Sequence, residues 1–103
     1  MNNLKDVLIL AITKIEEVTD LLYKQKNNEG YALLNSALIN VTAAIDQLFA
    51  YKIENNSLNI DENKLISNLT EAMHAMEEKD TVLLADILQY EIVEQFKTIV
   101  KIL

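Results

Sequence analysis

A single glycine and a complete lack of proline constrain most strongly what this chain can fold into. Among its 103 residues only Gly30 is a glycine, while half of all residues are apolar. Tight hairpins depend on glycine and proline, whereas the interiors of long helices exclude both. The sequence therefore predicts an all-α fold. Its length and apolar content predict one domain, residues 1–103, around one hydrophobic core.

Apolar residues recur at steps of three and four along four segments, which is the pattern of one face of an α-helix. The first predicted helix covers about residues 3–26, and the segment NNEG at 27–30 is the expected break before the second. The third and fourth helices meet near Lys79, and the fourth runs over about residues 81–102. The expected core positions are Leu4, Leu8, Ala11, Ile15, Val18 and Leu22; Tyr31, Leu34, Leu38, Val41, Ile45 and Leu48; Leu65, Leu69, Ala72 and Met76; and Ala85, Leu88, Ile92, Phe96, Ile99 and Leu103.

The segment ENNSLNIDEN, residues 54–63, is the clearest loop in the sequence. Its Asn, Ser and Asp side chains favour turns because they compete for backbone hydrogen bonds. Asp61, or Asn59 together with Glu62, is expected to cap the third helix, and Asp80 the fourth. Short connections make consecutive helices antiparallel neighbours, so the predicted architecture is an antiparallel up-down four-helix bundle.

The charge balance excludes several classes of partner. The formal net charge is −7, from 16 acidic residues against nine lysines. Such a chain lacks the basic surface that binds nucleic acids. Anionic membranes repel an acidic chain on the same grounds. It has no cysteine, hence no disulfide or thiolate metal site. The apolar run VLILAI at 7–12 is too short for a signal or a membrane span, so we expect a cytoplasmic protein.

Two carboxylates, Asp86 and Glu91, interrupt the apolar stretch LLADILQYEI at 83–92. On an α-helix they point about 140° apart, so one helix cannot present both to a substrate. We interpret them as residues at the solvated edge of the helix.

Glu71 and His74 have the Glu-x-x-His spacing of di-iron carboxylate bundles. Such a site needs a second Glu-x-x-His, but His74 is the only histidine, and both side chains are expected to point away from the core stripe. The sequence also lacks a glycine-rich phosphate loop. It therefore predicts no catalytic residues, no bound metal and no cofactor.

Some apolar residues lie outside the four predicted core stripes, at helical spacing on other faces. They are Leu83, Ile87 and Tyr90 in the fourth helix and Ile9, Ile12 and Tyr23 in the first. Contiguous exposed apolar patches mark contact surfaces, so these six are candidate interface residues. The alternative is that helix crossing angles or the short third connection turn these faces inward. Met73 and Met76 similarly suit either an adaptable binding groove or core filling.

The stretch EAMHAMEEKDTVLLADILQYEI, residues 71–92, resembles the C-terminal part of a group of small uncharacterised all-helical proteins of low-GC Gram-positive bacteria. A looser similarity reaches back through NNEGYALL at 27–34. The resemblance implies a compact helical domain and carries no activity and no site residues.

These observations favour a non-enzymatic helical module that binds another protein and itself forms homodimers. A second hypothesis is a chaperone or adaptor for an exported bacterial protein such as a flagellar one, by analogy of fold alone. A third is a metal-dependent bundle protein built on Glu71 and His74, against which the ligand count argues.

Overall fold

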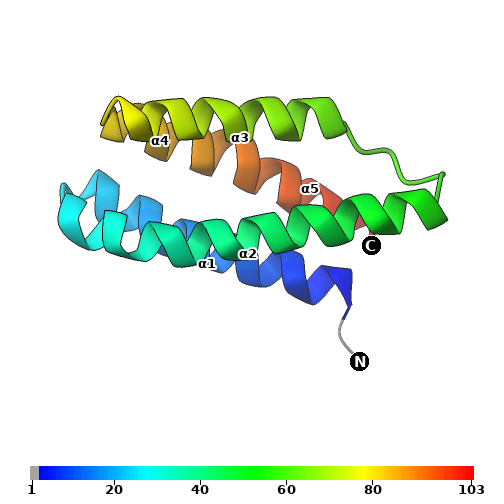
Figure 1. The fold of residues 1–103 in the computed structure, drawn as a ribbon. Helices are drawn as coiled ribbons and strands as arrows, with labels where there is room; N and C mark the ends of the chain where they lie inside the picture. The colour runs from blue at the N-terminus through cyan, green and yellow to red at the C-terminus, as the bar shows by residue number, and fades with distance from the viewer. Residues whose placement is uncertain (1–2) are drawn as a thin grey trace.

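The structure, a computed structural model, describes residues 3–103 and contains only helices and their connections within them (Figure 1). The elements are α1 (Leu4–Tyr23), α2 (Asn27–Glu54), α3 (Glu62–Glu77), α4 (Thr81–Asp86), the π-helix η1 (Ile87–Ile92) and α5 (Val93–Ile102). Because α4, η1 and α5 follow one another without interruption, they form one continuous fourth helix. The predicted all-α fold of four helices is confirmed.

Side-chain caps begin three of the four helices. Asn3 accepts a hydrogen bond from the Asp6 amide at the start of α1. Asp61 and Asp80 do the same for α3 and α4, at 2.9 and 3.1 Å from the amides they cap. Each cap satisfies a backbone donor that has no partner within the helix. The predictions for Asp61 and Asp80 are confirmed.

The first connection lies earlier than predicted. α1 ends at Tyr23 and α2 begins at Asn27, so NNEG at 27–30 is the first turn of α2 and not a break. Gly30 is buried, and its role is a close approach between helices. A Cβ added there would lie 2.6 Å from Cδ2 of Leu22. The lone glycine therefore lets α2 start close against the end of α1.

The two tight turns use residues other than glycine. Gln25 and Lys79 take left-handed backbone conformations, with φ of 63° and 58°. In both turns the next residue donates its N–H to the carbonyl five residues back, at 2.9 Å. This is the Schellman arrangement, which usually places glycine at the left-handed position. The chain thus makes two tight turns without glycine at the left-handed position.

The connection between α2 and α3, residues 55–61, is anchored to the core. Leu58 and Ile60 are buried in it, and Lys52 Nζ donates to the Ile60 carbonyl oxygen at 3.0 Å. The same ammonium pairs with Glu62 at 3.0 Å. The loop predicted at residues 54–63 is confirmed over 55–61, and its two apolar residues belong to the core.

Helix α1 is the centre of the packing. It lies along α2 on one side and along α4, η1 and α5 on another, while α3 packs on α4 and η1. Figure 1 shows the chain running one way along α1 and back along α2, then out along α3 and back along the fourth helix. The predicted core residues are buried or partly buried, except that Leu103 is exposed. Leu103 lies just beyond the last helical residue, Ile102.

Candidate functional site

Three of the six candidate interface residues gather around Asp86, where the end of α1 meets the fourth helix. Tyr23 Oη donates a 2.6 Å hydrogen bond to Asp86 Oδ1. Partial burial, this hydrogen bond and the charges of Asp86 and Tyr90 hold the pKa of Tyr23 well above its usual range. Leu83 lies one helical turn before Asp86. Tyr23, Leu83 and Tyr90 are all exposed and form what we call the tyrosine patch.

Ile9 is also exposed but belongs to another part of the surface. It precedes Tyr23 by about four helical turns, which places the two roughly 20 Å apart along α1. Ile9 therefore stays a candidate interface residue at a separate position on α1.

Ile12 is a core residue, only 8% exposed, so the expectation that it lies on an outer face is wrong. The reason is that α1 is covered by α2 on one side and by the fourth helix on another. A helix with two such neighbours buries a wider sector than one stripe. Thr19, further along α1, is buried for the same reason.

Ile87 is likewise buried, at 6% exposed, so its expected outer position is also wrong. That expectation rested on about 100° of rotation per residue, as in an α-helix. Ile87–Ile92 instead forms the π-helix η1, whose hydrogen bonds span five residues and whose turns hold more residues. The position of Ile87 is set before this turn begins, and its burial follows from the neighbours of the fourth helix. That helix packs on α1 on one side and on α3 on another, so it buries a wider sector than one stripe, including Ile87, Leu88 and Val93.

Polar pairs cross the seam between α1 and the fourth helix. Thr19 Oγ1 donates to Gln89 Oε1 at 2.9 Å, and the Glu16 carboxylate accepts from Lys97 at 3.2 Å. As residue numbers fall along α1 they rise along the fourth helix, so these two helices run antiparallel. A further pair, Gln95 with Asn68 at 2.7 Å, ties the fourth helix to α3.

The acidic candidates occupy edges and outer faces. Asp86 and Glu91 are partly exposed, while Glu71 and His74 are exposed on α3. Within residues 3–103 no three His, Cys, Asp or Glu side chains come together as metal ligands would. Glu71 and His74 point outward, as the sequence predicted.

The side of the bundle between α2 and α3 is built differently from the others. These two helices approach each other far less closely than α1 approaches α2. On α3, Met73 is 47% exposed, and Ile66, about two helical turns earlier, is 50% exposed. On α2, Ile39 is 70% exposed. Leu38 and Met76 are partly buried against the core at the same place. We call Leu38, Ile39, Ile66, Met73 and Met76 the α2–α3 seam.

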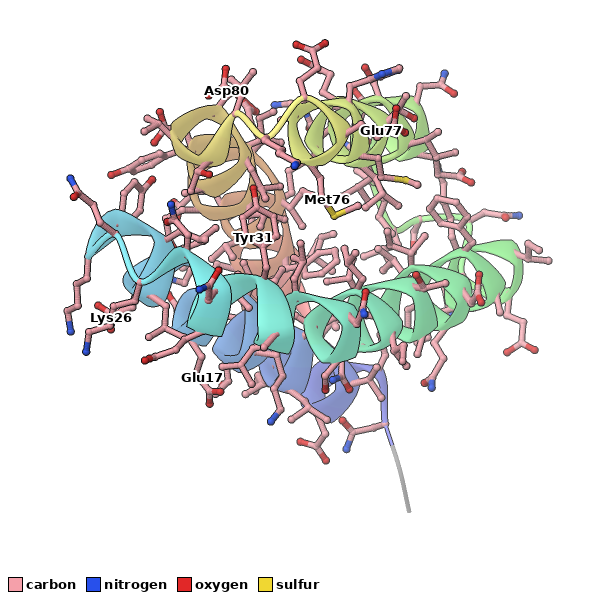
Figure 2. All side chains as sticks on the ribbon, turned by 60° about the vertical axis from the view of Figure 1, so that its left-hand side comes forward. Glu17, Lys26, Tyr31, Met76, Glu77 and Asp80 are labelled. Atoms are coloured by element: carbon pink, nitrogen blue, oxygen red, sulfur yellow. The ribbon has the colours of Figure 1, made fainter. Side chains whose placement is uncertain are left out.

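Two adjoining hollows follow this seam. The inner one is a narrow apolar crevice between α2 and α3, and the outer one is a shallow hollow of about 660 Å³ along α2. Leu38 lines both, which joins them. Figure 2 shows Met76 reaching from α3 toward α2, with Tyr31 standing on the α2 side. The crevice is lined by Leu34, Leu38, Ala72, Met73, Met76 and Leu84, and the hollow by Asn35, Leu38, Ile39, Thr42, Ala43 and Asp46.

Helix α2 is apolar well beyond what it buries. An 18-residue window of it has a mean hydropathy of 1.3, and 33% of that window is buried. By length and composition it is the one helix of residues 3–103 that could cross a membrane, a test that core helices of bundles also pass. The signal was present in the sequence, since residues 30–45 contain no charged side chain in a chain of net charge −7.

A family model described as a domain of unknown function (DUF8042) matches residues 1–102. No curated protein and no solved structure matches the chain.

Proposed function

We propose that this chain, which belongs to the family of domains of unknown function DUF8042, is a non-enzymatic protein-interaction module on an antiparallel up-down four-helix bundle. Its binding surface in this proposal is the α2–α3 seam. The observation that carries it is the exposure of apolar side chains on both helices, which pack on each other far less closely than α1 packs on α2. Contiguous exposed apolar surface of this kind marks contact sites.

The seam also has the chemistry of a helix-binding groove. Apolar side chains of two helices line a crevice next to a longer hollow, as in grooves that accept the apolar face of a third helix. Met73 and Met76 are flexible and polarisable, so they adapt to side chains of different shapes. A chaperone or adaptor in the cytoplasm that shields a segment of an exported protein is one role that such a groove would serve, by analogy of fold.

A photo-crosslinking residue tests the location of the surface. It is placed at Met73 in one variant and at His74 in a matched control, since His74 is the next residue, is also exposed, and points about 100° away around α3. In cells of the source organism we expect a discrete adduct with another protein at position 73 and none at position 74. No adduct at 73, or the same adduct at both positions, would reject the seam as the binding surface.

A second candidate is homodimer formation through the tyrosine patch. Tyr23, Leu83 and Tyr90 are exposed side by side, and tyrosine is enriched at protein interfaces. Two-fold dimers are the commonest soluble oligomers, and a patch of this kind would face its own copy. Sedimentation of the wild type at micromolar concentration and of a Leu83→Glu variant tests it. A dimer that becomes monomeric in the variant is the expected result, and a wild-type monomer at hundreds of micromolar would reject it.

A further inference from the structure

The seam carries an uneven charge. Asp46 lines the outer hollow on the α2 side, and neither the crevice nor this hollow is lined by a lysine. On α3, Glu77 is exposed one turn after Met73, on the same face. The apolar floor of the seam is therefore flanked by Asp46 along α2 and by Glu77 at one end on α3.

Lys52 and Lys79 lie at the two ends of the seam, and Glu77 lies at the same end as Lys79. At the end near the 55–61 connection, Lys52 is already neutralised by Glu62 at 3.0 Å. At the other end, Lys79 lines a separate hollow that it shares with Met76 and Tyr31. Between these ends a bound segment would meet apolar groups and the carboxylate of Asp46.

This charge pattern decides between two occupants. A second copy of the chain would bring another net charge of −7 to an acidic border, and like charges at an interface oppose association. A segment with lysine or arginine beside an apolar face would instead meet Asp46 and Glu77 as opposite charges. The seam is thus complementary to a basic partner and not to itself.

We infer that the α2–α3 seam binds a basic amphipathic helix of another protein. The inference rests on the proposed interaction function and names the class of partner. From Ile66 to Met76 the α3 side of the seam spans about 15 Å, which matches roughly three turns of a docked helix. Such a helix would present apolar anchors at i, i+3, i+4 and i+7, with basic residues on either side of them.

Three synthetic peptides of about 18 residues test this inference on the full chain. The first has leucines at helical spacing and lysines elsewhere, and the second replaces the lysines by glutamates. The third has the composition of the first in an order that gives no apolar face. We expect the first to bind at least about tenfold more tightly than either other, since it alone combines the apolar face with opposite charge. Added salt should weaken its binding.

The place of binding is read from the methyl signals of the methionines. Isotope-labelled Met73 and Met76, assigned through Met73→Leu and Met76→Leu, should shift on addition of the first peptide. Met73→Lys should weaken binding at least about tenfold by adding a cation and removing an anchor, while His74→Lys, with the same change in net charge, should not. Circular dichroism of both variants verifies that they remain helical.

Three results would overturn the inference. They are equal affinity for the lysine and glutamate peptides, lysine-peptide binding that leaves both methionine signals unmoved, and a wild-type dimer that Met73→Lys dissociates. A cellular crosslink at position 73 together with equal peptide affinities would keep the proposed function and reject only the basic partner. The absence of that crosslink, with the lysine peptide still bound selectively at the methionines, would count against the proposed function alone.

Discussion

The seam between α1 and the fourth helix and the seam between α2 and α3 occupy different sides of one small bundle, and they are held together in different ways. The first is closed over buried apolar side chains and crossed by Thr19–Gln89 and Glu16–Lys97. The second leaves apolar side chains half-exposed, and among the described residues its helices share one ion pair, Lys52–Glu62, at one end.

This difference separates stability from binding. Polar pairs between closely packed helices fix their register, because a slip would leave partly buried groups without partners. An apolar seam without such pairs tolerates rearrangement of its side chains, which a surface for partners of varied shape requires. Substitutions at the first seam should therefore lower stability, whereas substitutions at the second should alter binding and leave stability nearly unchanged.

The largest expected effect is at Ile87 in η1. Ile87→Glu would place a carboxylate in the core, at a cost of several kcal/mol against a total stability of about 5–15 kcal/mol for a domain. We expect the variant to be largely unfolded by circular dichroism. Leu83→Glu, one turn earlier on the same helix but exposed, is the control and should remain folded. If Ile87→Glu stays helical and cooperative, Ile87 does not belong to the core and the close packing of the fourth helix on α1 and α3 is wrong.

A smaller loss should follow from removing the polar pair between α1 and η1. Thr19→Val keeps the shape of a buried side chain but removes the hydroxyl that donates to Gln89, which should cost about 1 kcal/mol. Urea unfolding measures the loss. Thr42→Val makes the same chemical change on the exposed face of α2 and should change stability by less than about 0.5 kcal/mol. An equal loss of stability in Thr19→Val and Thr42→Val would mean that the Thr19–Gln89 hydrogen bond does not stabilise the seam between α1 and the fourth helix.

The elements of the fold were predictable because they depend on local chemistry. The three- and four-residue spacing of Leu8, Ala11 and Ile15 requires a helix with that face inward, and Asp61 and Asp80 have the side chains that cap helices. The first turn lies earlier than predicted because glycine is typical of helix breaks, whereas Gly30 lies inside α2. Gln25 makes the turn in a backbone conformation that the sequence does not signal.

The candidate site was less predictable because it depends on how closely neighbouring helices approach. A helical wheel puts Ile87 outside because it cannot show that the fourth helix packs on both α1 and α3. Met73 and Met76 suited both a groove and the core, and only the open packing of α2 against α3 distinguishes the two. Ile39 was overlooked, although the uncharged stretch around it was visible in the sequence.

At the open seam, the expected change in stability is close to zero. Ile39→Lys replaces a side chain that is 70% exposed, so it should alter the free energy of unfolding by less than about 0.5 kcal/mol. The same variant should bind the lysine peptide more weakly. Urea unfolding and peptide titration on one preparation measure both quantities. A loss of more than about 1 kcal/mol would show that Ile39 supports the fold and that the two seams are not divided as proposed.

The smallest expected effect concerns Tyr23 at the edge of the closed seam. Its pKa in the folded chain is raised by partial burial, then by the hydrogen bond it donates to Asp86, then by the charges of Asp86 and Tyr90. A raised pKa means that the folded state holds the proton more firmly than the unfolded state. The contribution to stability is therefore complete below the unfolded pKa of about 10 and is lost as pH rises above it.

Solvent weakens this effect of Tyr23 on stability because the side chain is 44% exposed. Between about pH 8 and pH 11 the wild type should consequently lose slightly more stability than Tyr23→Phe in urea unfolding. The variant cancels the background from titrating lysines, which both proteins share. If the difference between the two proteins is the same at both pH values, the Tyr23–Asp86 hydrogen bond does not couple this edge of the seam to the fold.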